Sequence, residues 1–146
     1  MALNDILALI DASRPARRGW RGRVELLGRP IEVRLTAAAL RALAARDRPL
    51  CAELELYFSC LIRKRVRFHD AAPGDSPALE RLFLRFRPVT TAQCRIDDHP
   101  DGPPLEVMPV AEPHRFVPDW LSIDHRRGRW SGEYGYLPRS GHSSTP

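Results

Sequence analysis

The chain of 146 residues has no run of apolar residues long enough to cross a membrane. Its first residues do not resemble a secretory signal either, because Asn4, Asp5 and Asp11 interrupt the apolar positions. Cysteine is scarce. The chain has three, Cys51, Cys60 and Cys94, and their spacing matches no disulfide framework or zinc site. These shortages predict a reducing, cytoplasmic setting with free thiols and no membrane partner.

Lysine is almost absent, since Lys64 is the only one among 23 basic residues. So strong a bias toward arginine is typical of GC-rich, bacterial-type coding, so only the positions of the arginines are informative. The net charge of +5 is uneven, with +8 in residues 1–96 and −3 in residues 97–146. Two interpretations stay open: the acidic part folds back over the basic part, or the basic part meets an external anionic partner.

Known catalytic motifs are missing too: there is no G-x-S-x-G, no H-E-x-x-H and no glycine-rich phosphate or dinucleotide loop. Asp97-Asp98-His99 and Asp124-His125 could each pair a base with an orienting carboxylate. Both fall in expected loops or turns, where such residues are ordinarily solvated. We therefore expect no catalytic residue and no cofactor, and keep a small enzyme with an Asp/His loop site as a second alternative.

A metal site is only weakly indicated. Cys94 and His99 are the candidate ligands, because thiolate and imidazole together suit zinc. Their spacing fits no established zinc pattern, and a free cysteine is commonly just a small buried apolar residue. We therefore predict no metal.

What the sequence does contain is a long alternating stretch from Glu53 to Phe68. Its apolar residues share one parity and its charged residues share the other, which is typical of a half-buried β-strand. Sixteen residues in one strand would extend about 50 Å, far beyond the usual five or six residues. We expect this stretch to bend, to carry a bulge or to project past the sheet.

The rest of the chain predicts short elements of both kinds. Thr36 is a good N-cap for a helix over 36–46, and residues 78–87 are ambiguous between helix and strand, with strand favoured. Glycine and proline between apolar alternations favour two hairpins. The other expected segments are an N-terminal helix from Leu3 to Ile10, a basic linker over 13–23, hairpins over 24–35 and 120–136, a proline-rich irregular segment over 97–118 with a short strand near 105–108, and a disordered tail over 138–146.

Together these patterns predict a single α+β domain over residues 1–137. We expect one antiparallel or mixed β-sheet of about five or six strands, with one or two helices packed on one face.

Pairing of 61–68 with 81–89 in antiparallel fashion would gather five arginines on one face: Arg63, Arg65, Arg67, Arg85 and Arg87. Like charges opposite one another in a sheet are unfavourable by about 0.2–1 kcal/mol each, so an anion is expected across this face. It could be internal, from Glu25, Glu32 or the acidic part of the chain, or it could belong to a partner.

The leading hypothesis is therefore a non-enzymatic binding or accessory protein whose arginine-rich sheet face engages an anionic partner. Tyr57 and Phe83, on the same parity as the arginines, would add apolar contact. An acidic protein surface is favoured over nucleic acid. An RNA- or single-stranded-DNA-binding module is the alternative, because such sheets place aromatic residues among basic ones, but no RNP-type string is present. A strand edge could also pair with a second copy.

Overall fold

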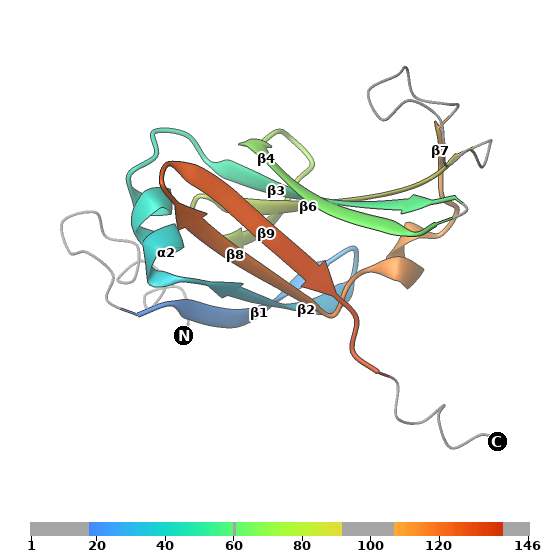
Figure 1. Cartoon of the computed structure of the whole chain (residues 1–146), viewed down its shortest axis with the longest axis horizontal. Helices are drawn as coiled ribbons and strands as arrows, with labels where there is room; N and C mark the ends of the chain where they lie inside the picture. The colour runs from blue at the N-terminus through green and yellow to red at the C-terminus, as the bar shows by residue number, and fades with distance from the viewer. Residues whose placement is uncertain (1–17, 60, 92–106, 139–146) are drawn as a thin grey trace.

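The computed structural model describes residues 18–59, 61–91 and 107–138, and in these ranges the chain forms nine strands, one α-helix and one short 3-10 helix (Figure 1). The strands lie in two stacked sheets. Sheet A has the order β1-β2-β8-β9, with β1 (Trp20–Leu26), β2 (Arg29–Leu35), β8 (Trp120–Arg126) and β9 (Arg129–Gly135). Sheet B has the order β4-β3-β6-β5, with β3 (Leu50–Phe58), β4 (Arg63–Asp70), β5 (Ser76–Leu79) and β6 (Leu82–Thr91), and β7 (Val107–Pro109) pairs with β6.

The prediction of a single sheet is thus wrong, while the coarser α+β class, mostly strand with one helix, is supported. Each sheet is built from two antiparallel hairpins joined by one parallel pair, β2 with β8 and β3 with β6. Local hairpins can be predicted from sequence, but which hairpins share a sheet depends on pairing between distant segments.

Both predicted hairpins in sheet A form. Their two-residue turns, Leu27-Gly28 and Arg127-Gly128, have positive φ at both positions, the geometry that matches the twist of a two-residue hairpin. Strand β1 begins at Trp20, so the predicted basic linker is wrong from that residue onward.

The stretch from Glu53 to Phe68 is not one strand but the hairpin β3–β4, with Tyr57 opposite Arg63. The alternation passes through the turn unchanged because partners in this register are both odd-numbered or both even-numbered. Residues of one parity therefore stay on one face of the sheet in both strands. A periodicity of two cannot by itself distinguish this hairpin from a longer strand.

Residues 78–87 form strand rather than helix, as favoured, in β5 and β6. The expected antiparallel pairing with 61–68 is wrong, because β6 pairs in parallel with β3, and β3 separates it from β4. A parallel pair requires a crossover, and the segment between Phe58 and Leu82 provides it.

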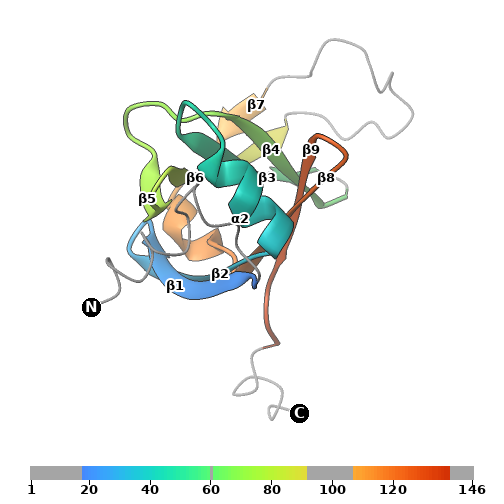
Figure 2. The same ribbon diagram turned by 90° about the vertical axis from the view of Figure 1, so that its left-hand side faces the viewer.

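Helix α2 (Ala37–Ala44) confirms the helix expected after Thr36, whose hydroxyl accepts a hydrogen bond from the Ala39 amide at 3.1 Å. The helix lies at one end of the two sheets, between them, rather than over one sheet face (Figures 1 and 2). Its buried residues, Ala39, Leu40 and Leu43, close that end of the core. The 3-10 helix η1 (Pro113–Phe116) packs on sheet B through an edge contact between Phe116 and Phe58.

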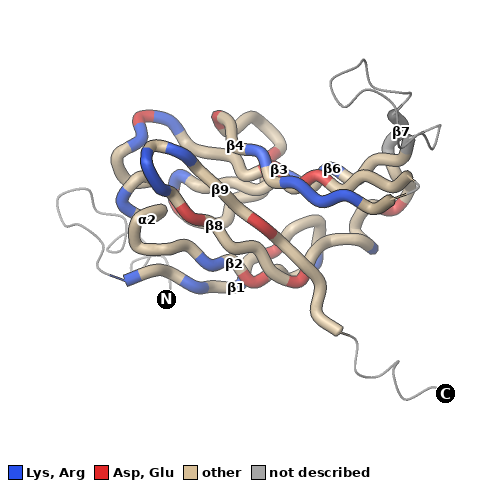
Figure 3. Tube along the Cα trace, in the orientation of Figure 1, with Lys and Arg blue, Asp and Glu red and all other residues tan. Residues whose placement is uncertain are grey.

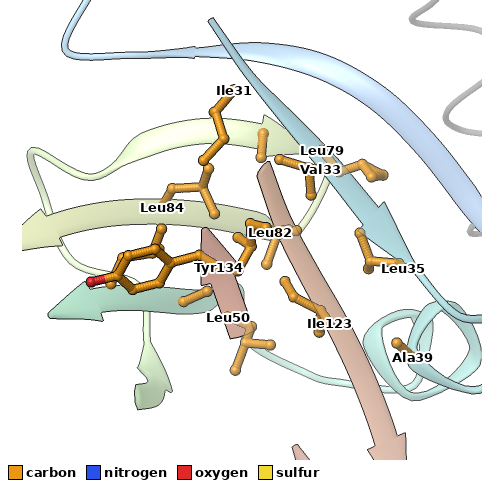
Figure 4. Close-up of a cluster of buried hydrophobic side chains, with 14 of the residues drawn as sticks. Ile31, Val33, Leu35, Ala39, Leu50, Leu79, Leu82, Leu84, Ile123 and Tyr134 are labelled. Atoms are coloured by element: carbon orange, nitrogen blue, oxygen red, sulfur yellow. The ribbon is translucent and has the colours of Figure 1, made fainter. Parts of the chain in front are cut away.

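Aliphatic side chains from both sheets fill the space between them (Figure 4). The labelled set there includes Ile31, Val33, Leu82, Leu84 and Ile123. Sheet A approaches sheet B closely where β9 passes β4: a Cβ on Gly132 would lie 3.1 Å from the Phe68 ring. Tyr134, in the same strand, is buried in this core, and its hydroxyl donates to the Glu55 carbonyl.

Several predictions fall outside the described residues: the N-terminal helix, residues 92–106 with Cys94, Asp97, Asp98 and His99, Cys60, and the tail from 139 onward. Within the described ranges, α2 is too short to cross a membrane.

Thr36 is expected to contribute to stability through its cap and through the hydrogen bond that its hydroxyl donates to Asp124 at 2.7 Å. Replacing Thr36 by Ala should lower the free energy of unfolding by about 0.5–2 kcal/mol, measured by urea denaturation. Thr36→Ser retains the hydroxyl and is the matched control. Equal loss in both variants would contradict a capping role.

Candidate arginine face of sheet B

The five arginines named from sequence lie on the side of sheet B that faces away from sheet A. Strand β3 runs between β4 and β6, so each outward residue of β3 has one neighbour on either side. Glu53 stands between Arg67 and Arg85, and Glu55 stands between Arg65 and Arg87. Acidic positions of β3 thus lie between basic positions of β4 and β6, and Figure 3 colours the basic and acidic positions along the chain. We call this surface the arginine face.

Glu55 is the centre of this face, and only 2% of the residue is exposed. Its carboxylate accepts hydrogen bonds from Arg67 Nε at 3.2 Å, from Arg87 Nη1 at 3.4 Å and from the Tyr57 hydroxyl at 3.1 Å. Burial, and then the neighbouring Glu55, raise the pKa of Tyr57, which keeps that hydroxyl protonated as a donor. Two of the five arginines are therefore matched by one buried carboxylate of the same chain.

Arg85 is matched as well. It forms a two-pronged pair with Asp75, with distances of 2.7 and 3.1 Å, and its Nη1 lies 3.6 Å from Glu53. Burial alone would raise the pKa of Asp75, but hydrogen bonds, above all from Arg85, outweigh it and hold that pKa below its ordinary value. His69 completes the group, with Nε2 3.5 Å from Glu53.

Cys51 lies beneath this group and is fully buried. Its burial, together with a hydrogen bond to Asp75, raises the pKa of the thiol to about 12. The thiol is thus a protonated donor to a carboxylate that Arg85 already neutralises.

Arg63 and Arg65 differ from the other three. Both are exposed on β4, and no carboxylate of the described residues lies within ion-pair distance of either. The turn that precedes them carries two exposed aliphatic residues, Leu61 at 51% and Ile62 at 66% exposure. One end of the arginine face therefore combines unmatched positive charge with exposed apolar surface.

The two aromatic residues predicted to assist the arginines are not brought together. Tyr57 stands opposite Arg63 and Val89, whereas Phe83 stands beside Cys51 at the other end of the face. Six residues of β6 separate the two positions, or about 20 Å at 3.3 Å per residue. Tyr57 alone accompanies the unmatched arginines.

The predicted sources of internal compensation are wrong for the described residues. Glu32 pairs with Arg21 and Arg34 on sheet A, and Glu25 forms no ion pair there. In the acidic part of the chain, the described pairs are local, Glu112 with Arg115 and Asp124 with Arg126. Compensation comes instead from Glu53, Glu55 and Asp75, which the sequence interpretation missed. For the two glutamates a signal was present, since they share the parity of Arg63, Arg65 and Arg67.

Asp124 and His125 are engaged in structural contacts. The Asp124 carboxylate accepts from the Thr36 hydroxyl and from the His125 amide, and these hydrogen bonds lower its pKa. The His125 ring meets Trp130 edge-on. Among the residues that the structure describes, no group of three or more His, Cys, Asp or Glu side chains is arranged to hold a metal ion.

Comparisons with protein-family models, curated proteins and solved structures found no match to this chain.

Glu55 should matter more for stability than the two unmatched arginines. Glu55→Ala leaves two arginines and a tyrosine without their acceptor, so we expect a loss of about 1–3 kcal/mol in urea denaturation. Arg63→Ala and Arg65→Ala, the controls, should stay within about 0.5 kcal/mol of the unchanged protein. A Glu55→Ala protein as stable as these controls would contradict the proposed centre of the face.

Asp75 should make stability depend on pH in a defined direction. A carboxyl whose pKa is lowered by folding contributes stability above its unfolded pKa, near 3.9, and that contribution disappears as pH falls through the folded pKa. Asp75→Asn should therefore be less stable than the unchanged protein at pH 7, and the difference should narrow below about pH 4. Urea denaturation at both pH values measures the difference in free energy of unfolding between the two proteins. A difference that grows in acid would contradict the ion pair between Asp75 and Arg85.

Proposed function

We propose that this protein is a binding or accessory protein that engages an anionic partner through Arg63 and Arg65. The observation that supports this most is the unequal matching of the arginine face. Three arginines have carboxylate partners within the chain, and these two have none among the described residues. Unmatched, exposed arginines can form bidentate contacts with carboxylates at little desolvation cost.

The partner that we favour is an acidic protein surface. Three carboxylates, from Glu53, Glu55 and Asp75, are interleaved with the arginines, so the arginines without a carboxylate partner lie at one end of the face. A phosphate backbone instead requires several cations along its path. Exposed Leu61 and Ile62 beside the arginines offer apolar contact, which protein interfaces combine with arginine.

Nucleic acid is the other outcome to be tested. Single-stranded nucleic acid is held by stacking on accessible aromatic rings together with phosphate contacts. On this face Tyr57 is half-buried and its hydroxyl is committed to Glu55, and Phe83 lies at the far end. The observations therefore give less support to a stacking platform than to a protein contact.

Binding should depend on the two unmatched arginines. With fluorescein-labelled oligoglutamate as the probe, Arg63→Ser/Arg65→Ser should weaken binding by about two- to thirtyfold in fluorescence anisotropy, since each of the two exposed pairs contributes about 0.2–1 kcal/mol. Arg23→Ser/Arg129→Ser removes the same charge from exposed positions of sheet A and should have little effect.

A single-stranded oligonucleotide of matched charge separates the two partner classes. We expect it to bind more weakly than oligoglutamate at physiological salt. Tighter binding of the oligonucleotide, with a steep fall as salt rises, would favour nucleic acid. If Arg63→Ser/Arg65→Ser and Arg23→Ser/Arg129→Ser weaken oligoglutamate binding equally, the proposed site is contradicted.

A further inference from the structure

Strand β4 forms one margin of sheet B. Its only hydrogen-bonded neighbour among the described strands is β3, and Figure 3 shows the run of basic positions along it. A strand at a margin presents unpaired backbone groups, to which another strand can add.

The register shows which backbone groups of β4 are unpaired. The amide of Ala71 donates to the carbonyl of Pro49 at 3.0 Å, and these two residues continue the β3–β4 register by one position beyond Asp70 and Leu50. Hydrogen-bonded and non-hydrogen-bonded pairs alternate along an antiparallel ladder. The odd-numbered residues of β4 therefore bond to β3, and the N–H and C=O groups of Lys64, Val66 and Phe68 point away from it, toward the margin.

Strand β9 leaves this margin unpaired. It contacts the side chains on the inner face of β4: Gly132 approaches Val66 and Phe68, and the Lys64 ammonium lies 5.8 Å from the centre of the Tyr134 ring. In the described part of the chain, no backbone hydrogen bond joins β9 to β4. Sheet A thus covers one face of β4, while none of the described strands pairs with its outward backbone groups.

The side chains of β4 determine what kind of strand fits there. Arg63 and Arg65 project from the arginine face at alternate positions and are unmatched. Residues directly opposite one another in neighbouring strands share a face. An added strand would therefore set its residues of one parity against these arginines, and its other parity toward the inner side, beside Lys64 and Val66.

We propose, building on the function above, that the anionic partner is an extended acidic segment of another protein that adds to β4 as an antiparallel strand. Acidic residues at every second position face Arg63 and Arg65. Small or apolar residues at the positions between them form the backbone hydrogen bonds to Lys64 and Val66.

A second copy of this chain does not fit the same edge. Two β4 strands paired with each other would bring arginines against arginines, and like charges directly opposite are unfavourable in a sheet. The same arginines therefore disfavour pairing between two copies of β4 and favour an acidic strand.

The first test compares peptides of one composition with the intact protein. A nine-residue peptide in which glutamate alternates with threonine should bind about tenfold more tightly than a peptide with the same residues in one glutamate block, measured by fluorescence anisotropy. N-methylation of the alternating peptide at its threonines should abolish this advantage, because those amides face β4. N-methylation at its glutamates should not, because those amides face away.

A pair of protein variants tests the edge from the other side. Lys64→Pro and Lys64→Thr remove the same charge, but only the proline removes the outward backbone donor. Proline is tolerated on edge strands where its nitrogen faces outward, and circular dichroism checks that the fold is kept. The alternating peptide should bind Lys64→Pro about tenfold more weakly than Lys64→Thr.

Failure of this inference can be told from failure of the proposed function. If the alternating and block peptides bind equally, and the Arg63→Ser/Arg65→Ser variant loses both, strand addition is overturned. The charge-based function is then retained. Equal binding of the two N-methylated peptides also overturns strand addition, even where Lys64→Pro does not fold. Binding of neither acidic peptide overturns both.

Discussion

The structure depends on strand β3, both faces of which are closed to water by different means. Leu54 lies in the core between the sheets, and the next residue, Glu55, is equally buried on the opposite face. Removal of a carboxylate from water costs several kcal/mol unless other groups replace the lost solvation. Arg67, Arg87 and Tyr57 do so for Glu55. Much of the arginine face therefore stabilises the sheet.

This constraint limits what the arginines can do for a partner. An arginine that holds a buried glutamate would have to abandon it, and leave its charge unpaired, in order to bind another anion. Arg67, Arg85 and Arg87 are committed in this way, whereas Arg63 and Arg65 are not. The proposed binding role therefore rests on the matching of charges and not on the number of basic residues.

The elements that depend on neighbouring residues could be predicted from sequence: both hairpins of sheet A, the helix after Thr36, and the alternation from Glu53 to Phe68. What escaped prediction depends on distant pairing. The alternation of apolar and charged residues in that stretch is the same for a long strand and for a hairpin. Nothing in the sequence near Glu55 indicates that Arg87 lies beside it in a parallel strand. The pairing of Asp75 with Arg85 could not be predicted for the same reason, because the loop that carries Asp75 contacts Arg85 only when β5 and β6 have paired.

One group on this face resembles a reactive site in its composition but not in its electrostatics. Cys51 is hydrogen-bonded to Asp75 and stands opposite His69 in β4, so the group contains the residue types of a nucleophile, a base and an orienting carboxylate. A reactive cysteine requires surroundings that lower the pKa of its thiol, whereas burial and the acceptor Asp75 raise that of Cys51 to about 12. Arg85 lies on the carboxylate and thereby stabilises the anion on Asp75 instead of on sulfur. The group therefore anchors the crossover loop to the sheet, and the proposed binding is left to the unmatched end of β4.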